Sequence, residues 1–468
     1  MNRRFARAVA FVVLTAVALG GCAMFDTIGG WFSGGGSKSK LRGERISVMA
    51  NAEAILPDTE MKDVKVVLPP PYKNPDWPQP GGYATNALYH LEASGPLRQI
   101  WQADAGKGSD DDSRLTAPPV VADGKIFILD AQAHAFAFDV ASGRRIWSDN
   151  LAEKGETNIW HTLTLGAIGQ DTSIDPSKGF GGGIAYDKGA IYATTGFGDV
   201  YALNAADGKQ IWKTNLGVPI VNSPVALGGR VFVSSQDNHF VALAEADGRK
   251  LWDHQAIAES AGILESTSAA VAGDFVIAPY TSGELYALNV QNGRPAWSDT
   301  LTASGAPTAL SELDDIAGRP VVDRDMVFAI SHAGVMVAIN LNSGERVWSR
   351  DIGGIQTPWA AGDFVYVTTT DDLLLCLARK DGRVKWMHHL QRWADPDSKD
   401  GPITWAGPVL VSDRLVLVSS VGTAVSISPY TGDLMGRAEI PAGAYIAPVV
   451  ANDTLYLLTN DAELVALR

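Results

Sequence analysis

Hydrophobic and polar residues alternate in short runs along the chain after residue 95. In one stretch the apolar runs "KIFILD" (125–130) and "HAFAFD" (134–139) are preceded by "PPVV" and followed by "RRIWSD". Runs of this length predict β-strands, and the tight turns "ADGK" and "ASGR" between them predict an antiparallel sheet of four strands. Each turn carries a glycine, because a tight link between strands needs a residue that accepts a positive φ.

The last turn and strand of this unit recur along the chain. "AFDVASGRRIW" (137–147) returns in altered form as "ALNAADGKQIW" (202–212) and in four further copies, each with a glycine four residues before a tryptophan. A degenerate copy, "SISPYTGDLMG" (426–436), has Gly436 in the tryptophan position. Repeated four-stranded units with variable insertions and no helices are typical of a β-propeller. We expect each tryptophan to pack against the neighbouring sheet and to bury about 150–250 Å². The tryptophans are Trp101, Trp147, Trp212, Trp252, Trp297, Trp348 and Trp386.

The two ends of the chain complete each other in this pattern. The C-terminal stretch 447–468 supplies three strands and stops where the turn and the tryptophan strand should follow, whereas "LRQIW" (97–101) aligns with "GRRIW" (143–147). Seven whole units and this composite unit predict an all-β fold, an eight-bladed β-propeller of four-stranded antiparallel blades over residues 95–468. An N-terminal strand would complete the last blade, and closure would remove the exposed edges of an open array.

The N-terminal residues differ from the repeats. Residues 1–21 have a basic start and an apolar run too short to span a membrane comfortably, which is the outline of an export signal. The signal ends in "LGGC", and small residues before Cys22 resemble a bacterial lipobox, so we expect cleavage before Cys22 and a lipid on its thiol. Residues 22–94 contain "GGWFSGGGSKSK" and "LPPPYKNPDWPQPGG", a composition that predicts a flexible or extended tether.

Charge and cysteine content exclude several classes of function. The net charge is −14 and becomes about −17 without the signal, which contains three arginines and no acids. This charge argues against a protein that binds nucleic acid or acidic lipid headgroups, since both need a basic surface. Cys376 lies in the apolar run "DLLLCLA", which predicts that it is a buried strand residue.

The repeat A-x-[DN]-x-x-x-G-x-x-x-W is similar to the tryptophan-docking repeat of pyrroloquinoline-quinone-type propellers. With the lipobox and the split closing blade, the chain from Cys22 to Arg468 resembles the BamB family, the propeller lipoproteins of the outer-membrane β-barrel assembly machinery. The resemblance implies a non-catalytic scaffold without a cofactor, anchored by lipid on the periplasmic side of the outer membrane. It also implies binding to a periplasmic POTRA domain of BamA and to other members of the complex, with unfolded outer-membrane proteins as further candidate partners.

Most of the variation in length falls in the links between one blade and the next, which should emerge on one face. Two of these links, 256–266 and 300–319, combine apolar residues with acids, as partner surfaces often do. The alternative is that the apolar residues of the second link pack onto the ring. In the family the corresponding links contact BamA, and "LDDIA" (313–317) matches one family motif except at Ala317, while Ile263 stands near the place of an arginine in the other. The candidate partner-binding residues are Ile263, Leu264, Glu265, Leu310, Leu313, Asp314, Asp315 and Ile316.

Two other functions remain open at this stage. A propeller lipoprotein of this kind could bind a different periplasmic protein or a cell-wall component. A quinone-dependent dehydrogenase would need a calcium site, a catalytic Asp and, in most relatives, vicinal cysteines. The chain has no paired cysteines, and His388 and His389 lack the spacing of a metal motif, so we expect no catalytic, cofactor-binding or metal-binding residues.

Overall fold

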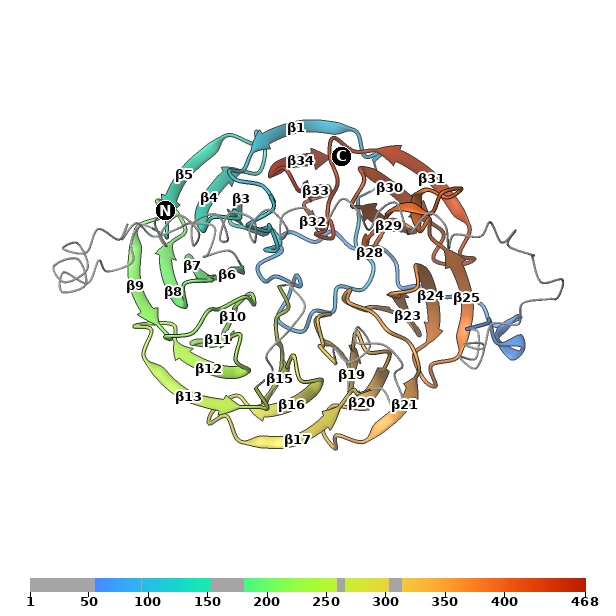
Figure 1. The fold of residues 1–468 in the computed structure, drawn as a ribbon, viewed down its shortest axis with the longest axis horizontal. Helices are drawn as coiled ribbons and strands as arrows, with labels where there is room; N and C mark the ends of the chain where they lie inside the picture. Colours follow the sequence, from blue (N-terminus) through green and yellow to red (C-terminus); the bar gives the residue numbers. More distant parts are fainter. Residues whose placement is uncertain (1–54, 94, 153–180, 259–265, 303–313) are drawn as a thin grey trace, which may run out of the picture. The chain divides into compact units, whose positions relative to one another are not determined.

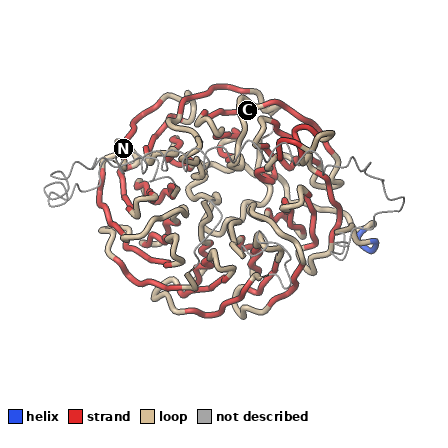
Figure 2. The backbone as a smooth tube through the Cα atoms, viewed as in Figure 1, coloured by secondary structure: helices blue, strands red, loops and turns tan. Residues whose placement is uncertain are grey.

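The computed structural model describes residues 55–93, 95–152, 181–258, 266–302 and 314–468. Leu56–Arg468 form one compact unit. Eight four-stranded antiparallel sheets are arranged around a central axis in this unit, and their innermost strands face that axis (Figure 1). The prediction of an eight-bladed β-propeller is confirmed. Strands and connecting loops account for nearly all of the described chain (Figure 2).

Each sheet runs from an inner to an outer strand, and the inner strand has three residues in every sheet except those that begin with β6 and β28. The first four sheets contain β2 (Val120–Ala122), β3 (Lys125–Leu129), β4 (His134–Asp139) and β5 (Arg145–Asn150); β6 (Gly182–Asp187), β7 (Ala190–Thr195), β8 (Asp199–Asn204) and β9 (Gln210–Asn215); β10 (Val225–Leu227), β11 (Arg230–Ser234), β12 (His239–Ala244) and β13 (Lys250–Gln255); and β14 (Ala270–Ala272), β15 (Phe275–Pro279), β16 (Glu284–Asn289) and β17 (Pro295–Thr300).

The next three sheets follow the same order, and a separate hairpin precedes the seventh. They contain β18 (Val321–Asp323), β19 (Met326–Ile330), β20 (Met336–Asn340) and β21 (Arg346–Arg350); β22 (Trp359–Ala361), β23 (Phe364–Thr368), β24 (Leu373–Ala378) and β25 (Val384–His389); the hairpin β26 (Trp393–Asp395) and β27 (Asp400–Pro402); and β28 (Trp405–Val411), β29 (Arg414–Ser419), β30 (Thr423–Ile427) and β31 (Leu434–Glu439).

The eighth sheet joins the two ends of the repeat region. It contains β32 (Val449–Ala451), β33 (Thr454–Leu458) and β34 (Glu463–Leu467) from the C-terminus, and β1 (Gln99–Asp104) as its outer strand. β1 pairs with β34 in antiparallel register, with Trp101 opposite Ala466. The second strands of the sheets are almost wholly buried, whereas the outer strands consist mainly of exposed and half-buried residues, so the core lies between the faces of adjacent sheets.

The repeated tryptophan connects each sheet to the next one. The indole Nε1 of Trp147 donates a hydrogen bond of 3.1 Å to the carbonyl of Ala205 in the following sheet, and Trp297 donates one of 2.7 Å to the carbonyl of Leu341. In both cases the acceptor lies three residues before the glycine of the next repeat. The same indole-to-carbonyl hydrogen bond is made by Trp101, Trp212, Trp252, Trp348 and Trp386.

The repeated glycine lies directly against the preceding tryptophan ring. A Cβ placed on Gly208 would lie 2.8 Å from Cε3 of Trp147, and one on Gly432 would lie 2.7 Å from Cε3 of Trp386. Gly208 also has a φ of +73°, which an L side chain rarely adopts. The glycine therefore turns the chain into the outer strand and leaves room for the neighbouring indole.

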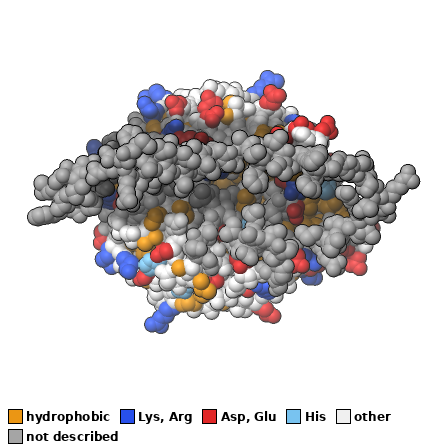
Figure 3. Space-filling view, viewed as in Figure 1, with side chains coloured by type: hydrophobic (Ala, Val, Ile, Leu, Met, Phe, Trp, Pro, Cys, Tyr) orange, Lys and Arg blue, Asp and Glu red, His pale blue; other side chains and the backbone are white. Residues whose placement is uncertain are grey.

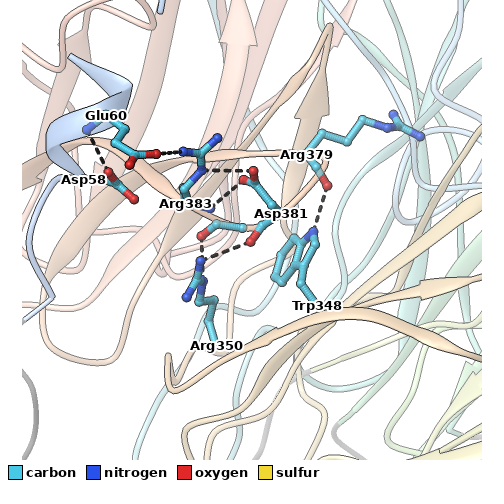
Figure 4. A network of polar contacts seen from close by, with 8 residues as sticks. Asp58, Glu60, Trp348, Arg350, Arg379, Asp381 and Arg383 are labelled. Carbon is cyan, nitrogen blue, oxygen red and sulfur yellow. Dashed lines mark hydrogen bonds and ion pairs between the residues drawn. The ribbon is translucent and has the colours of Figure 1, made fainter.

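Residues 56–93 differ from the expectation of a flexible tether. They belong to the same compact unit as the sheets, and Trp77, Leu88 and Leu91 are buried. The short 3₁₀ helix η1 (Thr59–Met61) lies at the outer strand β25, where the backbone amide of Asp58 donates to the carbonyl of Val384. Glu60 pairs with Arg383 at 2.9 Å (Figure 4).

Residues 72–91 then follow the inner strands around the central axis, which we call the channel (Figure 1). Inner strands have one unpaired edge, and this segment supplies hydrogen-bond partners for it, which explains why a proline-rich sequence is ordered here. All eight sheets are contacted. The hydrogen bonds join Trp77 to Val121, Pro78 to Tyr186, Gln79 to Ala226, Ala84 to Val271, Thr85 to Val322, Tyr89 to Trp359, Leu91 to Leu410 and Asn74 to Asn452.

Candidate functional site

The links between sheets form a distinct face of the ring. Because the strands of every sheet run in the same order, each link from an outer strand to the next inner strand leaves the ring on the same side; we name this side the link face. The hairpin β26–β27 lies in one such link. Parts of three other links, 153–180, 259–265 and 303–313, lie outside the described residues.

Some of the candidate partner-binding residues lie within the described part of the chain, and the others lie outside it. Ile263, Leu264, Glu265, Leu310 and Leu313 lie outside the described residues, as does Cys22. Asp314, Asp315 and Ile316 are described, and they lead into the inner strand β18.

The described part of this link is largely buried, which differs from the predicted exposed surface. Ile316 is fully buried in a cluster with Leu301 and Val337, and its amide donates to the carbonyl of Tyr280 at 3.4 Å. Asp315 is 4% exposed, and its backbone carbonyl accepts a hydrogen bond of 2.9 Å from His332. For Ile316 the structure thus agrees with packing onto the ring. The reason is positional, because the chain must enter the ring here to begin β18.

A cavity of about 420 Å³ lies at the centre of the ring. Its walls come from the links where they meet the inner strands, and part of its lining comes from the N-terminal segment through Trp77, Asn86 and Leu88. Sequence reasoning missed this contribution, because a tether was expected there. The interspersed Asn, Gln, His and Trp of residues 74–90 are the signal that could have indicated burial.

The cavity contains basic side chains and no acidic ones. Arg114 and Arg319 both line it, and no Asp or Glu is found among its described lining residues. Arg319 Nη2 donates a hydrogen bond of 2.6 Å to the carbonyl of Ser266, and the guanidinium of Arg114 lies 5.8 Å from the ring centre of Tyr445. Each guanidinium thus has one contact that orients it in the lining of the cavity.

This lining does not fit a calcium-bound quinone. Calcium needs several carboxylate and amide oxygens as ligands. The cavity offers side-chain amide oxygens only from Asn86 and Gln356, and Oε1 of Gln356 already accepts a hydrogen bond of 3.1 Å from the amide of Gly407. Across the described ranges no group of three or more His, Cys, Asp or Glu side chains is placed to hold a metal ion.

Two titratable groups with strongly raised pKa values, Glu245 and Cys376, are not among the residues that line this cavity. Burial and the nearby charge of Asp187 raise the pKa of Glu245 to about 7. Glu245 follows β12 at a tight turn, and its backbone carbonyl accepts the indole hydrogen bond of Trp212. Burial likewise raises the pKa of the Cys376 thiol, which pairs in register with Trp386 inside the sheets. Both groups therefore belong to the packing of the ring.

Side chains of both charges lie along the rim in the space-filling view (Figure 3). Among the residues that the structure describes, no helix is long and apolar enough to cross a membrane.

Curated relatives resemble this chain over most of its length. The outer membrane protein assembly factor BamB of Yersinia pestis is 25% identical over 370 residues, which cover 79% of this chain and 88% of the relative. The same factor from Burkholderia pseudomallei is 25% identical over 376 residues, covering 80% and 88%.

Solved structures share the fold. BamB from Moraxella catarrhalis matches with a TM-score of 0.60 and 16% identity, covering 80% of this chain and 98% of that chain. Quinohemoprotein alcohol dehydrogenase from Comamonas testosteroni also has a TM-score of 0.60, with 13% identity and coverage of 85% and 81%. The fold is thus shared by assembly factors and enzymes, whereas the sequence model of the outer membrane protein assembly factor BamB matches residues 150–388, just over half of the chain. The chain belongs to the BamB family.

Proposed function

We propose that this protein is a non-catalytic scaffold of the outer-membrane β-barrel assembly complex, which binds BamA and assists the folding and insertion of outer-membrane proteins. The observation that carries this proposal is the family match, since residues 150–388 include both links predicted to contact a partner. Signal cleavage and lipidation at Cys22 would attach it to the outer membrane on the periplasmic side.

The link face is the surface that we assign to BamA, through one of its periplasmic POTRA domains. Within the link 300–319, Asp314 is the described candidate that keeps partial exposure, and it directly follows Leu313 in sequence. An acid next to apolar residues suits the centre and rim of a protein interface. The buried Asp315 and Ile316 would support this surface from below.

A rigid ring supports the scaffold role. Seven indole–carbonyl hydrogen bonds connect successive sheets, and the segment 72–91 connects all eight at the channel. A preorganised surface loses little conformational entropy when it binds, so more of the interaction energy appears as affinity.

A membrane pull-down with the tagged, lipidated chain tests the BamA contact. We expect Leu313→Ala/Asp314→Ala to reduce the recovery of BamA by about tenfold, which corresponds to about 1.4 kcal/mol of binding free energy. Trp393→Ala/Asp397→Ala is the matched control, because it alters an apolar and an acidic residue in another link of the same face. The control should recover BamA as the wild type does.

Two outcomes would count against the proposal in different ways. Undiminished recovery of BamA by Leu313→Ala/Asp314→Ala would remove the assigned contact site. Recovery of no BamA by the wild-type chain would remove the assembly role and favour a lipoprotein that binds another periplasmic partner.

A further inference from the structure

One of the eight interfaces between sheets lacks the tryptophan contact. It lies between the sheet β28–β31 and the closing sheet of β32, β33, β34 and β1. In β31, Gly436 pairs with Ser426, just as Trp386 pairs with Cys376 in the preceding sheet. Gly436 therefore occupies the position from which an indole enters the other seven interfaces.

The glycine that normally receives the indole is also replaced at this interface. Leu97 lies four residues before Trp101, where every other repeat has its glycine, and its φ is +54°. Leu97 thus keeps the positive φ of the repeat glycine, although it carries a side chain. The small residue of the pair, Gly436, is now on β31, and the bulky residue, Leu97, is at the closing sheet. The leucine side chain is smaller than the indole that fills the corresponding space at the other interfaces.

A cavity of about 320 Å³ remains between the two sheets, and we name it the seam cavity. Its walls are mainly apolar side chains of β29, β33 and β34. Gly436 and Leu97 both line it, and a Cβ on Gly436 would meet no atom within 4 Å. The outer wall of the cavity therefore has an open position at β31. The apolar wall residues include Val416, Val418, Leu455, Leu457, Val465 and Leu467.

The start of β31 is exposed and apolar, and the strand has a free edge. Leu434 and Met435 precede Gly436 in β31 and are 53% and 56% exposed. In the order of its sheet, β31 pairs only with β30, so its other edge is unpaired within that sheet. An extended peptide can pair with such an edge and insert alternate side chains into pockets beside it.

Polar side chains complete the lining of the seam cavity. Arg414 lines the seam cavity, and its Nη2 donates hydrogen bonds to the carbonyls of Ala93 at 3.0 Å and Gly95 at 3.1 Å. Its Nε is buried and has no hydrogen-bond partner in the described part of the chain.

We propose that the seam cavity binds an aromatic side chain, carried by an extended segment of another polypeptide that lies along β31. The seven other interfaces supply the argument for the occupant, since each fills the corresponding space with an indole. The inference rests on the proposed function, because unfolded barrel precursors consist of segments with alternating apolar residues and aromatic girdles. It assigns to the outer edge of the ring a contact with such segments that is separate from the link face.

Peptide binding to the lipidated chain in detergent tests this assignment. The probe is a fluorescent peptide of about ten residues, the length of a barrel strand, with alternating Thr and Val and a central Trp. The control peptide has Ala in place of Trp. We expect the Trp peptide to bind at least about tenfold more tightly by fluorescence anisotropy, because only its indole fills the cavity. Equal affinity of the two peptides would overturn the proposal.

The variant Leu97→Gly/Gly436→Trp separates occupation of the cavity from damage to the fold. It restores the glycine and tryptophan of the other repeats, so we expect a higher midpoint of thermal unfolding together with loss of peptide binding. Ile211→Ala is the control, since Ile211 is 54% exposed on β9, whose interface already holds Trp212. The control should bind the Trp peptide as the wild type does. Retained binding by the double variant would contradict the site.

The two proposals fail separately. Loss of peptide binding by Leu97→Gly/Gly436→Trp with normal recovery of BamA would support a second surface. Failure of the wild-type chain to recover BamA would count against the assembly role. The peptide measurement would still test whether the seam cavity binds an aromatic side chain. A wild-type chain that recovers BamA and shows no preference for the Trp peptide would overturn the seam cavity alone.

Discussion

At the scale of the residue, one glycine and one tryptophan act as a pair across each filled interface. The glycine adopts a positive φ, and its missing Cβ leaves the space that the preceding indole occupies. The indole nitrogen then donates to a carbonyl three residues before that glycine. The two requirements on the glycine are independent, so substitutions can separate them.

Gly208→Ala should destabilise the protein more than Gly189→Ala. The φ angles are +73° and +82°, so both substitutions carry the cost of a left-handed alanine, about 1–2 kcal/mol. Only at Gly208 does the new Cβ meet an indole, that of Trp147, whereas nothing lies within 4 Å at Gly189. Displacing the ring should cost about 1–3 kcal/mol more. Midpoints of urea unfolding measure the difference, and equal shifts would contradict the proposed contact.

At the scale of the element, the segment 72–91 acts as an inner strap around the channel. Gln79 illustrates its contribution, because its side chain is 4% exposed and contacts two neighbouring sheets. Its Nε2 donates to the carbonyls of Tyr186 at 2.9 Å and Ala226 at 3.0 Å, and its Oε1 accepts from the amide of Ala226 at 3.0 Å. One side chain thus satisfies backbone groups of β6 and β10 together.

Gln79→Ala should lower the stability of the ring, because the truncation leaves these buried backbone groups without partners. We expect a loss of about 1–3 kcal/mol in the free energy of unfolding. Gln210→Ala is the matched control, since Gln210 is exposed at the start of β9. Urea unfolding followed by tryptophan fluorescence measures both variants, and an equal response of the two would argue against the strap as a stabilising element.

At the scale of the whole unit, closure of the ring depends on a strand from the beginning of the chain. β1 is the outer strand of a sheet whose other three strands come from the C-terminus. Trp101, on that strand, makes the indole contact with the first sheet through the carbonyl of Val140. Loss of β1 would therefore expose an edge of the eighth sheet and remove one interface contact at the same time.

Two truncated chains compare the strap with the closing strand. A chain that begins at Gly95 lacks the strap and keeps β1, and we expect it to fold with a lower thermal midpoint. A chain that begins at Ala105 lacks both, and we expect it to aggregate or unfold without a cooperative transition. Gel filtration and circular dichroism distinguish these outcomes. A second chain as stable as the first would show that β1 is dispensable for closure.

The repeats could be predicted from sequence because their signals are local. The glycine-to-tryptophan spacing and the alternating runs lie within single units. The match of "LRQIW" (97–101) to "GRRIW" (143–147) identifies the outer strand of the last unit, so counting the units gives eight blades. The same alignment already contained the exchange of Leu97 and Gly436. Its meaning required the structure, since these residues lie far apart in sequence and meet only across the closed ring.

Local patterns in the sequence specify the blade, the number of blades and the position of the closing strand, because short-range turns and strand pairing repeat along the chain. Tertiary structure alone decided the course of residues 72–91, the burial of Asp315 and Ile316, and the presence of the seam cavity. A proline-rich segment has no periodicity to indicate burial, and its order comes from the free edges of inner strands that are distant in sequence. Those edges face one channel only after the ring has closed.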